Sequence, residues 1–141
     1  MPDSTVNPDT VRAYAETEYH VSALVPFTLK VGQYSPELKQ AYADMEAGTA
    51  FFITPCNPYS KILPNEENLE LQQRLASELA EHKLKFLNAV GKHPESDWPG
   101  EAGYLVFGLT PEEANAMGMR WQQNAIVYCK ADAVPRLVLL R

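Results

Sequence analysis

The chain has 141 residues, the size of one ordinary domain. Hydrophobic residues make up 45% and charged residues 21%, which excludes a disordered chain because this composition supplies enough apolar surface for a core. Acidic residues outnumber basic ones by 18 to 12, and the formal net charge of −6 argues against nonspecific nucleic-acid binding, which normally uses a basic face. No apolar run reaches the roughly 20 residues of a membrane-spanning helix. We therefore expect neither a nucleic-acid partner nor a membrane.

The start of the chain and the cysteines indicate the compartment. Residues 1–5 lack the positive charge and the apolar stretch of a secretory signal. Cys56 and Cys129 lie far apart in no paired spacing motif, so reduced thiols are their simplest state. The cysteines and the three histidines show no metal-ligand spacing, and the chain has no glycine-rich phosphate loop. We expect a cytoplasmic protein with no metal and no cofactor.

Helix boundaries are the clearest local signals. Three prolines that follow Asn, Ser or Thr are typical of the first position of a helix. One of these caps, Thr110, forms a capping box with Glu113, and Asn65 is the expected cap of a fourth helix. Gly48 and Gly118 are the expected stop signals. The predicted helices span residues 8–18, 36–47, 66–82 and 111–118.

Strand signals alternate with these helices. The first two strands are expected to form a hairpin with Pro26 at the bend, and residues 91–100 form a polar, turn-rich loop. The alternation predicts the α/β class: one domain over residues 1–141, with a mixed β-sheet and about four helices packed on it. The predicted strands span residues 19–24, 27–31, 49–54, 84–90, 104–107, 123–129 and 137–140.

The first candidate functional segment is the loop that follows strand 49–54. Ligands of open α/β sheets bind beyond the carboxyl ends of the strands, and Asn57 and Ser60 offer hydrogen bonds there. The same residue types are ordinary turn formers, and that structural role is the simpler interpretation. Asn68 is a second candidate, because Asn is unfavourable inside a helix. Acidic residues beside it in the first turn disfavour a phosphate ligand and leave a cation, an amine or an amide open.

Two amide side chains enter the strand at 123–129. Gln123 and Asn124 alternate in direction, so at least one of them points toward the core. An unpaired buried amide costs about 1–3 kcal/mol and therefore needs a partner. That partner is either a ligand or the backbone of a loop, and we favour a structural lock on the loop around Asn57.

A tryptophan and a carboxylate precede the strand at 104–107. Glu101 beside Trp98 is a candidate acid or base with a raised pKa. A surface glutamate next to a loop anchor is the commoner arrangement, so both interpretations remain open.

These segments form four blocks with a definite order and spacing. They resemble the bacterial family called domain of unknown function 3293, over about residues 19–129. The sequence departs from that pattern at Pro55 and Cys56, where a small residue and an aromatic one are expected. The resemblance implies a small bacterial cytoplasmic protein and no activity, since the family has none established. The blocks are Thr54-x-x-Asn57-Pro58-x-Ser60, Glu67-Asn68, Trp98-x-x-Glu101 and Gln123-Asn124-Ala125.

Three hypotheses of function follow. The leading one is a binding or interaction module whose amide-rich pocket takes a polar small molecule, neutral or amine-bearing, or a peptide. The first alternative is a small hydrolase or transferase with Glu101 as general acid or base. The second is a structural domain whose sheet serves homodimerisation or partner docking. The candidate site residues are Asn57, Ser60, Asn68, Trp98, Glu101, Gln123 and Asn124.

Overall fold

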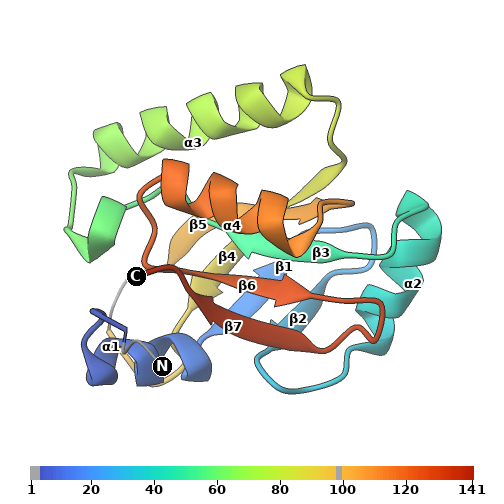
Figure 1. The fold of residues 1–141 in the computed structure, drawn as a ribbon, viewed down its shortest axis with the longest axis horizontal. Coiled ribbons are helices and arrows are strands. Elements are labelled where there is room, and N and C mark those ends of the chain that lie inside the picture. Colours follow the sequence, from blue (N-terminus) through green and yellow to red (C-terminus); the bar gives the residue numbers. More distant parts are fainter. Residues whose placement is uncertain (1–3, 98–99) are drawn as a thin grey trace.

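The computed structural model describes residues 4–97 and 100–141 (Figure 1). Seven strands form one sheet in the order β2-β1-β4-β5-β3-β6-β7. The helices are α1 (Pro8–Glu16), α2 (Pro36–Met45), α3 (Asn65–Glu81) and α4 (Pro111–Arg120). The strands are β1 (Glu18–Val21), β2 (Phe27–Lys30), β3 (Ala50–Ile53), β4 (Phe86–Lys92), β5 (Glu101–Phe107), β6 (Ala125–Cys129) and β7 (Pro135–Leu139). The predicted α/β class and the predicted β1–β2 hairpin are confirmed.

The prediction of a mixed sheet is wrong for the described strands, because every neighbouring pair is antiparallel. The helices α3 and α4 do connect strands that run in the same direction, as helix–strand alternation predicts. However, β5 lies between β3 and β4, and β3 lies between β5 and β6. The parallel strands β3 and β4 are thus separated by β5, and the parallel strands β5 and β6 are separated by β3, each of which is antiparallel to both of its neighbours.

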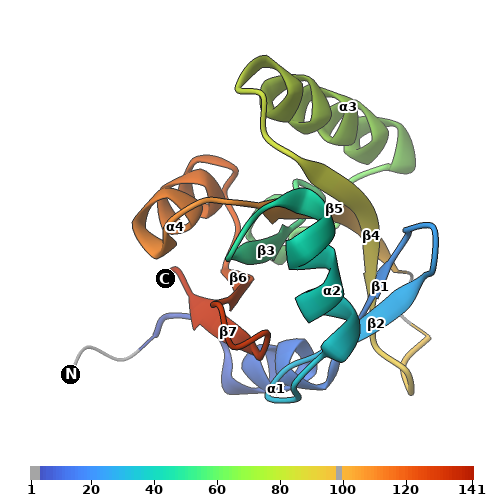
Figure 2. The ribbon, with the colours of Figure 1, turned by 90° about the vertical axis from the view of Figure 1, so that its right-hand side faces the viewer.

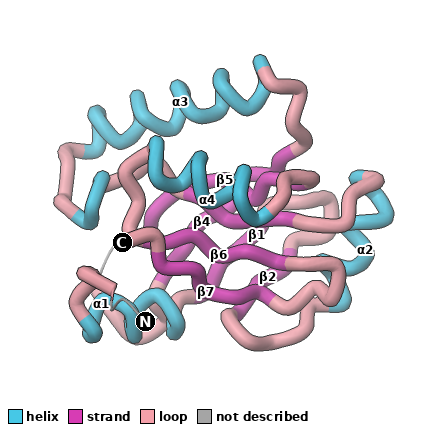
Figure 3. The backbone as a smooth tube through the Cα atoms, in the orientation of Figure 1, coloured by secondary structure: helices cyan, strands magenta, loops and turns pink. Residues whose placement is uncertain are grey.

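The sheet is strongly curled. Figure 2 shows it as an arch from β7 to β2, with α2 in front of its concave side. The segments next to the two edge strands meet, because Gly32 N donates to Pro135 O at 2.8 Å and Ser35 N donates to Ala133 O at 3.0 Å. Figure 3 shows the same curled strands in magenta, in the orientation of Figure 1. The curl gives the sheet an enclosed face and an outer face.

Both faces are packed by alternate residues of the same strands. On β3, Phe52 belongs to the concave core, which α2 completes with Leu38 and Tyr42. Phe51 and Ile53 point the other way, into the core beneath α3 and α4. Figure 1 shows α2 and α1 at opposite ends of the curled sheet. The concave core is therefore plugged at the α2 end, whereas α1, which has no buried residue, lies across the other end.

Helix α1 ends two residues earlier than predicted, at Glu16, and three of the residues expected to mark helix boundaries do not do so. Pro64, and not Asn65, stands before the first turn of α3. Helix α2 ends at Met45, and the residue that caps it is Glu46, in the left-handed conformation with φ 53°, and not Gly48. Gly118 lies inside α4 and does not end it. A Cβ atom at this position would lie 2.5 Å from Leu140 Cδ1, which explains why a glycine stands there. Close packing of α4 on the C-terminal segment, and not termination, requires that glycine.

Strand β4 begins and ends two residues later than the predicted strand 84–90. A left-handed residue at Lys83, φ 57°, extends the turn after α3. At the far end, Gly91 pairs with Tyr19 and Lys92 pairs with Glu18, so the polar loop starts at His93. No helix of the described residues has the length and apolar composition to cross a membrane.

Candidate functional site

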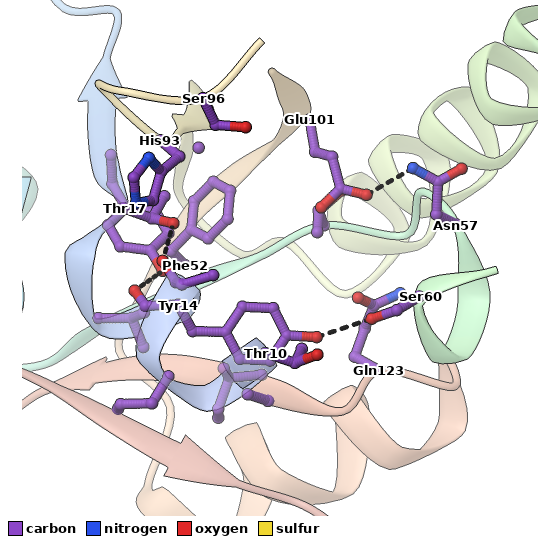
Figure 4. Close-up of a pocket in the computed structure, with 18 of the residues that line it drawn as sticks. Thr10, Tyr14, Thr17, Phe52, Asn57, Ser60, His93, Ser96, Glu101 and Gln123 are labelled. Atoms are coloured by element: carbon purple, nitrogen blue, oxygen red, sulfur yellow. Dashed lines mark hydrogen bonds between the residues drawn. The ribbon is translucent and has the colours of Figure 1, made fainter. Parts of the chain in front are cut away.

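A cavity of about 480 Å³ lies between α1 and the open end of the concave face (Figure 4). Its walls come from α1, from six of the seven strands and from the loops that follow β3 and β4. Residues far apart in the sequence therefore meet around one space. The volume is within the range of small-molecule pockets, about 300–1,000 Å³.

The floor of the cavity is apolar. It consists of Tyr19 from β1, Phe52 from β3, and side chains of β6 and β7 that include Val127 and Leu137. The rings of Tyr19 and Phe52 contact each other with centroids 4.8 Å apart. These residues belong to the concave core, so the cavity is the part of that core that α2 does not fill.

The roof is one face of α1. Thr10, Ala13, Tyr14 and Thr17 line the cavity with the spacing i, i+3, i+4, i+7, which places them on a single side of the helix. The sequence analysis missed these residues. The spacing was a usable signal, but the residues are mostly small and polar, so the face does not resemble an ordinary buried stripe.

Glu101, the first residue of β5, lies half-buried at one wall of the cavity. Its Oε2 accepts a hydrogen bond of 2.6 Å from Asn57 Nδ2. Burial raises the pKa of the Glu101 carboxyl, and the hydrogen bond from Asn57 acts in the opposite direction. The net result is a raised pKa at a carboxyl group that faces the cavity.

Asn57 is the centre of the hydrogen bonds that position Glu101. Its Oδ1 accepts from Leu63 N and from Asn68 Nδ2, each at 2.9 Å, and its own N–H donates to Asn68 Oδ1 at 3.0 Å. With the oxygen occupied in this way, the amide nitrogen of Asn57 is left to face Glu101. Asn68 thus acts behind the wall, as the residue that orients Asn57.

The loop around Asn57 has an unusual backbone. Asn57, Tyr59 and Ser60 have φ of 48°, 53° and 63°, in the left-handed region that residues other than glycine rarely adopt. Gln122, across from them, has φ 58°, and its carbonyl accepts from Tyr59 N at 2.7 Å. Such conformations cost about 1–3 kcal/mol each and persist where the surroundings impose them, often at ligand sites.

The two amides, Gln123 and Asn124, lie just before β6, which begins two residues later than the predicted strand 123–129, and they hold this loop in place. Gln123 Nε2 donates to Cys56 O at 3.4 Å, and Asn124 Nδ2 donates to Ser60 Oγ at 2.9 Å. Arg141 donates to Asn124 Oδ1 at 3.0 Å. Hydrogen bonds from the two residues just before β6 therefore reach the loop after β3 at two points.

The structure brings together six of the seven candidate residues. Asn57, Ser60, Glu101 and Gln123 line the cavity. Asn68 and Asn124 lie behind it and bond to residues that line it. Trp98 lies outside the described residues. Sequence analysis missed His93 and Ser96, which line the wall on the side opposite Glu101 in Figure 4. Their loop gave no more specific signal than its polarity.

Tyr14 links α1 to the loop, and its hydroxyl group is expected to hold the roof closed. Its Oη lies 2.8 Å from Ser60 Oγ and accepts from Asn124 Nδ2 at 3.3 Å. Tyr14→Phe should make local opening of α1 easier by about 1 kcal/mol, the typical net value of a hydrogen bond. Amide hydrogen exchange of α1 measures this, with the exposed Tyr34→Phe as control. Equal exchange in the two variants would contradict it.

The pKa of Glu101 predicts a pH effect on stability. Because burial raises that pKa, the folded chain binds the proton more tightly than the unfolded chain. The contribution of Glu101 to the free energy of unfolding is then fully present below the usual pKa of a glutamate, and it is lost as pH rises through the raised pKa. Glu101→Gln should abolish this loss, so the variant gains stability relative to wild type as pH rises to neutral. Urea midpoints at several pH values measure it, with the exposed Glu112→Gln as control. A constant difference at all pH values would disprove it.

The chain matches one protein family. The family described as "Protein of unknown function (DUF3293)" matches residues 53–126, just over half of the chain, and this range contains all four blocks that line or support the cavity. No curated protein and no solved structure matches the chain. The matched range supplies Asn57, Asn68, Glu101 and Gln123, whereas α1 and the floor residue Tyr19 lie outside it. The chain belongs to the DUF3293 family of proteins of unknown function.

Proposed function

We propose that this chain is a binding module for a small molecule that has an apolar body and a polar group. The ligand occupies the cavity between α1 and the concave face of the sheet. Its apolar body lies on the floor made by Tyr19, Phe52 and Val127. Its polar group faces the wall that carries Glu101 and Asn57.

One observation carries this proposal. A cavity of about 480 Å³ has an apolar floor and a half-buried carboxylate whose orientation is set by the buried amide of Asn57, which Asn68 holds in turn. An apolar pocket with a few converging polar groups is the usual form of a small-molecule site. The left-handed residues of the loop after β3 add support, because strained backbone is concentrated at such sites.

Filling the cavity tests the proposal. Ala13 on α1 lines the cavity, whereas Ala15 on the same helix is exposed and does not line it. Fragments that bind the wild-type chain, found by ligand-observed NMR, should lose binding to Ala13→Phe by at least about tenfold and keep binding to Ala15→Phe. Circular dichroism confirms that both variants fold. Equal binding to both variants, or no fragment that binds wild type, would refute the binding module.

A second function is favoured by the raised pKa of Glu101. A carboxyl group that holds its proton closer to neutral pH is suited to general acid–base catalysis in a hydrolase or transferase. Asn57 and the hydroxyl of Ser60 would then polarise the substrate. Chromogenic esters and glycosides test this, and turnover should fall about a hundredfold in Glu101→Gln. Equal turnover in wild type and variant would exclude Glu101 as the acid or base.

We propose the bacterial cytoplasm as the place of this binding. Cys56 and Cys129 are both buried and unpaired with each other, which suits a reducing compartment.

A further inference from the structure

The charges around the cavity have one sign. Among the described residues that line it, Glu101 and Asp9 are acidic and none is Lys or Arg. His93 is the one residue there that can carry a positive charge, and Figure 4 shows it across the cavity from Glu101. A carboxylate or phosphate ligand would therefore meet repulsion at the Glu101 wall without a fixed cation to offset it.

Glu101 is also short of partners. Within the described part of the chain its carboxylate accepts one hydrogen bond, from Asn57, and forms no ion pair. A carboxylate has room for about four hydrogen bonds on its two oxygens. A half-buried carboxylate with one hydrogen bond has lost part of its hydration without gaining a cation. A charged hydrogen-bond donor offsets most of this desolvation free energy.

Other acceptors surround the same space. Figure 4 shows the hydroxyl groups of Tyr14 and Ser60 below Glu101, directed toward each other. These two hydroxyls share one hydrogen bond with each other and each accepts from Asn124 Nδ2, so one lone pair between them is left as an acceptor beside the free positions on Glu101. A group with several N–H donors fits this set better than a single hydroxyl does.

We infer that the ligand is a primary amine: an ammonium group at Glu101, carried on an apolar body that lies on Tyr19 and Phe52. This inference rests on the proposed binding function and deepens it by naming the chemical class. The ammonium group donates to the free positions of the Glu101 carboxylate and to the remaining lone pair of the Tyr14 and Ser60 hydroxyls. The ring floor accepts an aliphatic or aromatic body, and the aromatic faces of Tyr19 and Phe52 are compatible with a nearby cation.

Three probes of nearly equal shape test the charge preference. Phenethylamine is cationic, 2-phenylethanol is neutral and phenylacetate is anionic, and each carries the same ring. Titration calorimetry or ligand-observed NMR on the wild-type chain should show phenethylamine binding at least about tenfold more tightly than the alcohol, because a charged hydrogen bond exceeds a neutral one. Phenylacetate should bind least. Alcohol binding as tight as that of the amine would overturn the inference.

Two variants assign the preference to Glu101. In Glu101→Gln the amine should lose its advantage over the alcohol, whereas the exposed Glu112→Gln should retain it. On the wild-type chain, the side-chain carboxyl ¹³C resonance of Glu101 should shift with phenethylamine and stay in place with the alcohol. This measurement keeps the test valid if the variant does not fold. An amine preference that persists without Glu101, or no shift at its carboxyl, would overturn the inference.

One more probe distinguishes a free small amine from a peptide amino terminus as the source of the ammonium group. The tetrapeptide Phe-Ala-Ala-Ala amide presents the same ring and an ammonium group at a peptide amino terminus. Tighter binding of phenethylamine indicates a free small amine, and tighter binding of the tetrapeptide indicates a peptide terminus as the source. If the fragment screen finds ligands that Ala13→Phe excludes but the amine has no advantage, the binding function stands and the amine class fails. If no fragment binds, the binding function itself fails.

Discussion

Replacing Gly103 with alanine is expected to destabilise the fold more than the same replacement at Gly91, the other glycine in the described strands. Gly103 lies in β5 next to β3, and a Cβ atom there would lie 2.3 Å from Ile53 O and 3.0 Å from Phe52 Cζ. The nearest of these atoms belongs to backbone in the middle of the sheet and cannot turn aside. We expect a loss of about 3 kcal/mol or more, the upper range for overpacking.

Chemical denaturation of Gly103→Ala measures this loss. Gly48→Ala is the matched control, because no atom lies within 4 Å of the corresponding Cβ position there. Since Phe52 is in the cavity floor and Glu101 is two residues before Gly103, the variant should also lose binding of any cavity ligand. An unfolding midpoint equal to that of the control would show that β3 and β5 can separate at little cost.

Replacing Asn57 with alanine is expected to cost about 3 kcal/mol. The change removes the acceptor of Leu63 N and the shorter of the two hydrogen bonds of Asn68 Nδ2, both part-buried, and a buried polar group left unpaired costs about 1–3 kcal/mol. Alanine is also disfavoured at φ 48°, where asparagine is tolerated. In the same variant the pKa of Glu101 should rise further, because the hydrogen bond that lowers it is gone.

Two measurements separate these effects. Denaturation gives the stability loss, and a pH titration of the Glu101 carboxyl ¹³C resonance gives the direction of the pKa change. Asn65→Ala is the control, since Asn65 is exposed at the start of the same α3 helix that carries Asn68. If Asn57→Ala is as stable as the control, the network around Asn57 contributes nothing to the loop. A Glu101 pKa that falls would contradict the electrostatic role of Asn57.

The two variants address different parts of the site. Gly103→Ala changes the packing of β3 against β5, and binding is lost because those two strands shift. Asn57→Ala leaves the sheet in place and removes what orients one carboxylate. A comparison of ligand binding in both variants therefore distinguishes a requirement for the fold from a requirement for the position of Glu101.

Local features of the sequence determined most of the secondary structure. The caps Asn7, Ser35 and Thr110 each accept a backbone hydrogen bond in the first turn, as expected. These interactions span only two or three residues, so their outcome depends little on the rest of the chain. The errors occurred where distant packing overrides a local preference, as at Gly118, whose close neighbours are Leu140 and Ile126.

The candidate site was only partly predictable. The chemical character of Asn57, Glu101 and Gln123 singled them out as residues that ordinary packing does not demand. Whether they meet depends on β5 inserting between β3 and β4, an order that no local pattern encodes. The roof residues of α1, Tyr14 among them, could not be assigned because their face is complementary to a space that exists only in the folded chain.

By itself, the sequence determined the α/β class, the start of each capped helix, the excess of acidic groups and the identity of the polar residues around the loop after β3. Hydrogen bonds between near neighbours and the apolar–polar periodicity produce these features, so they can be deduced without distant contacts. The tertiary structure alone decided the antiparallel strand order, the curl that leaves part of the concave face unfilled, and the closure of that space by α1. Those features depend on contacts between residues tens of positions apart, such as Asn57 with Glu101 and Tyr14 with Ser60, whose energies appear only when the whole sheet has formed.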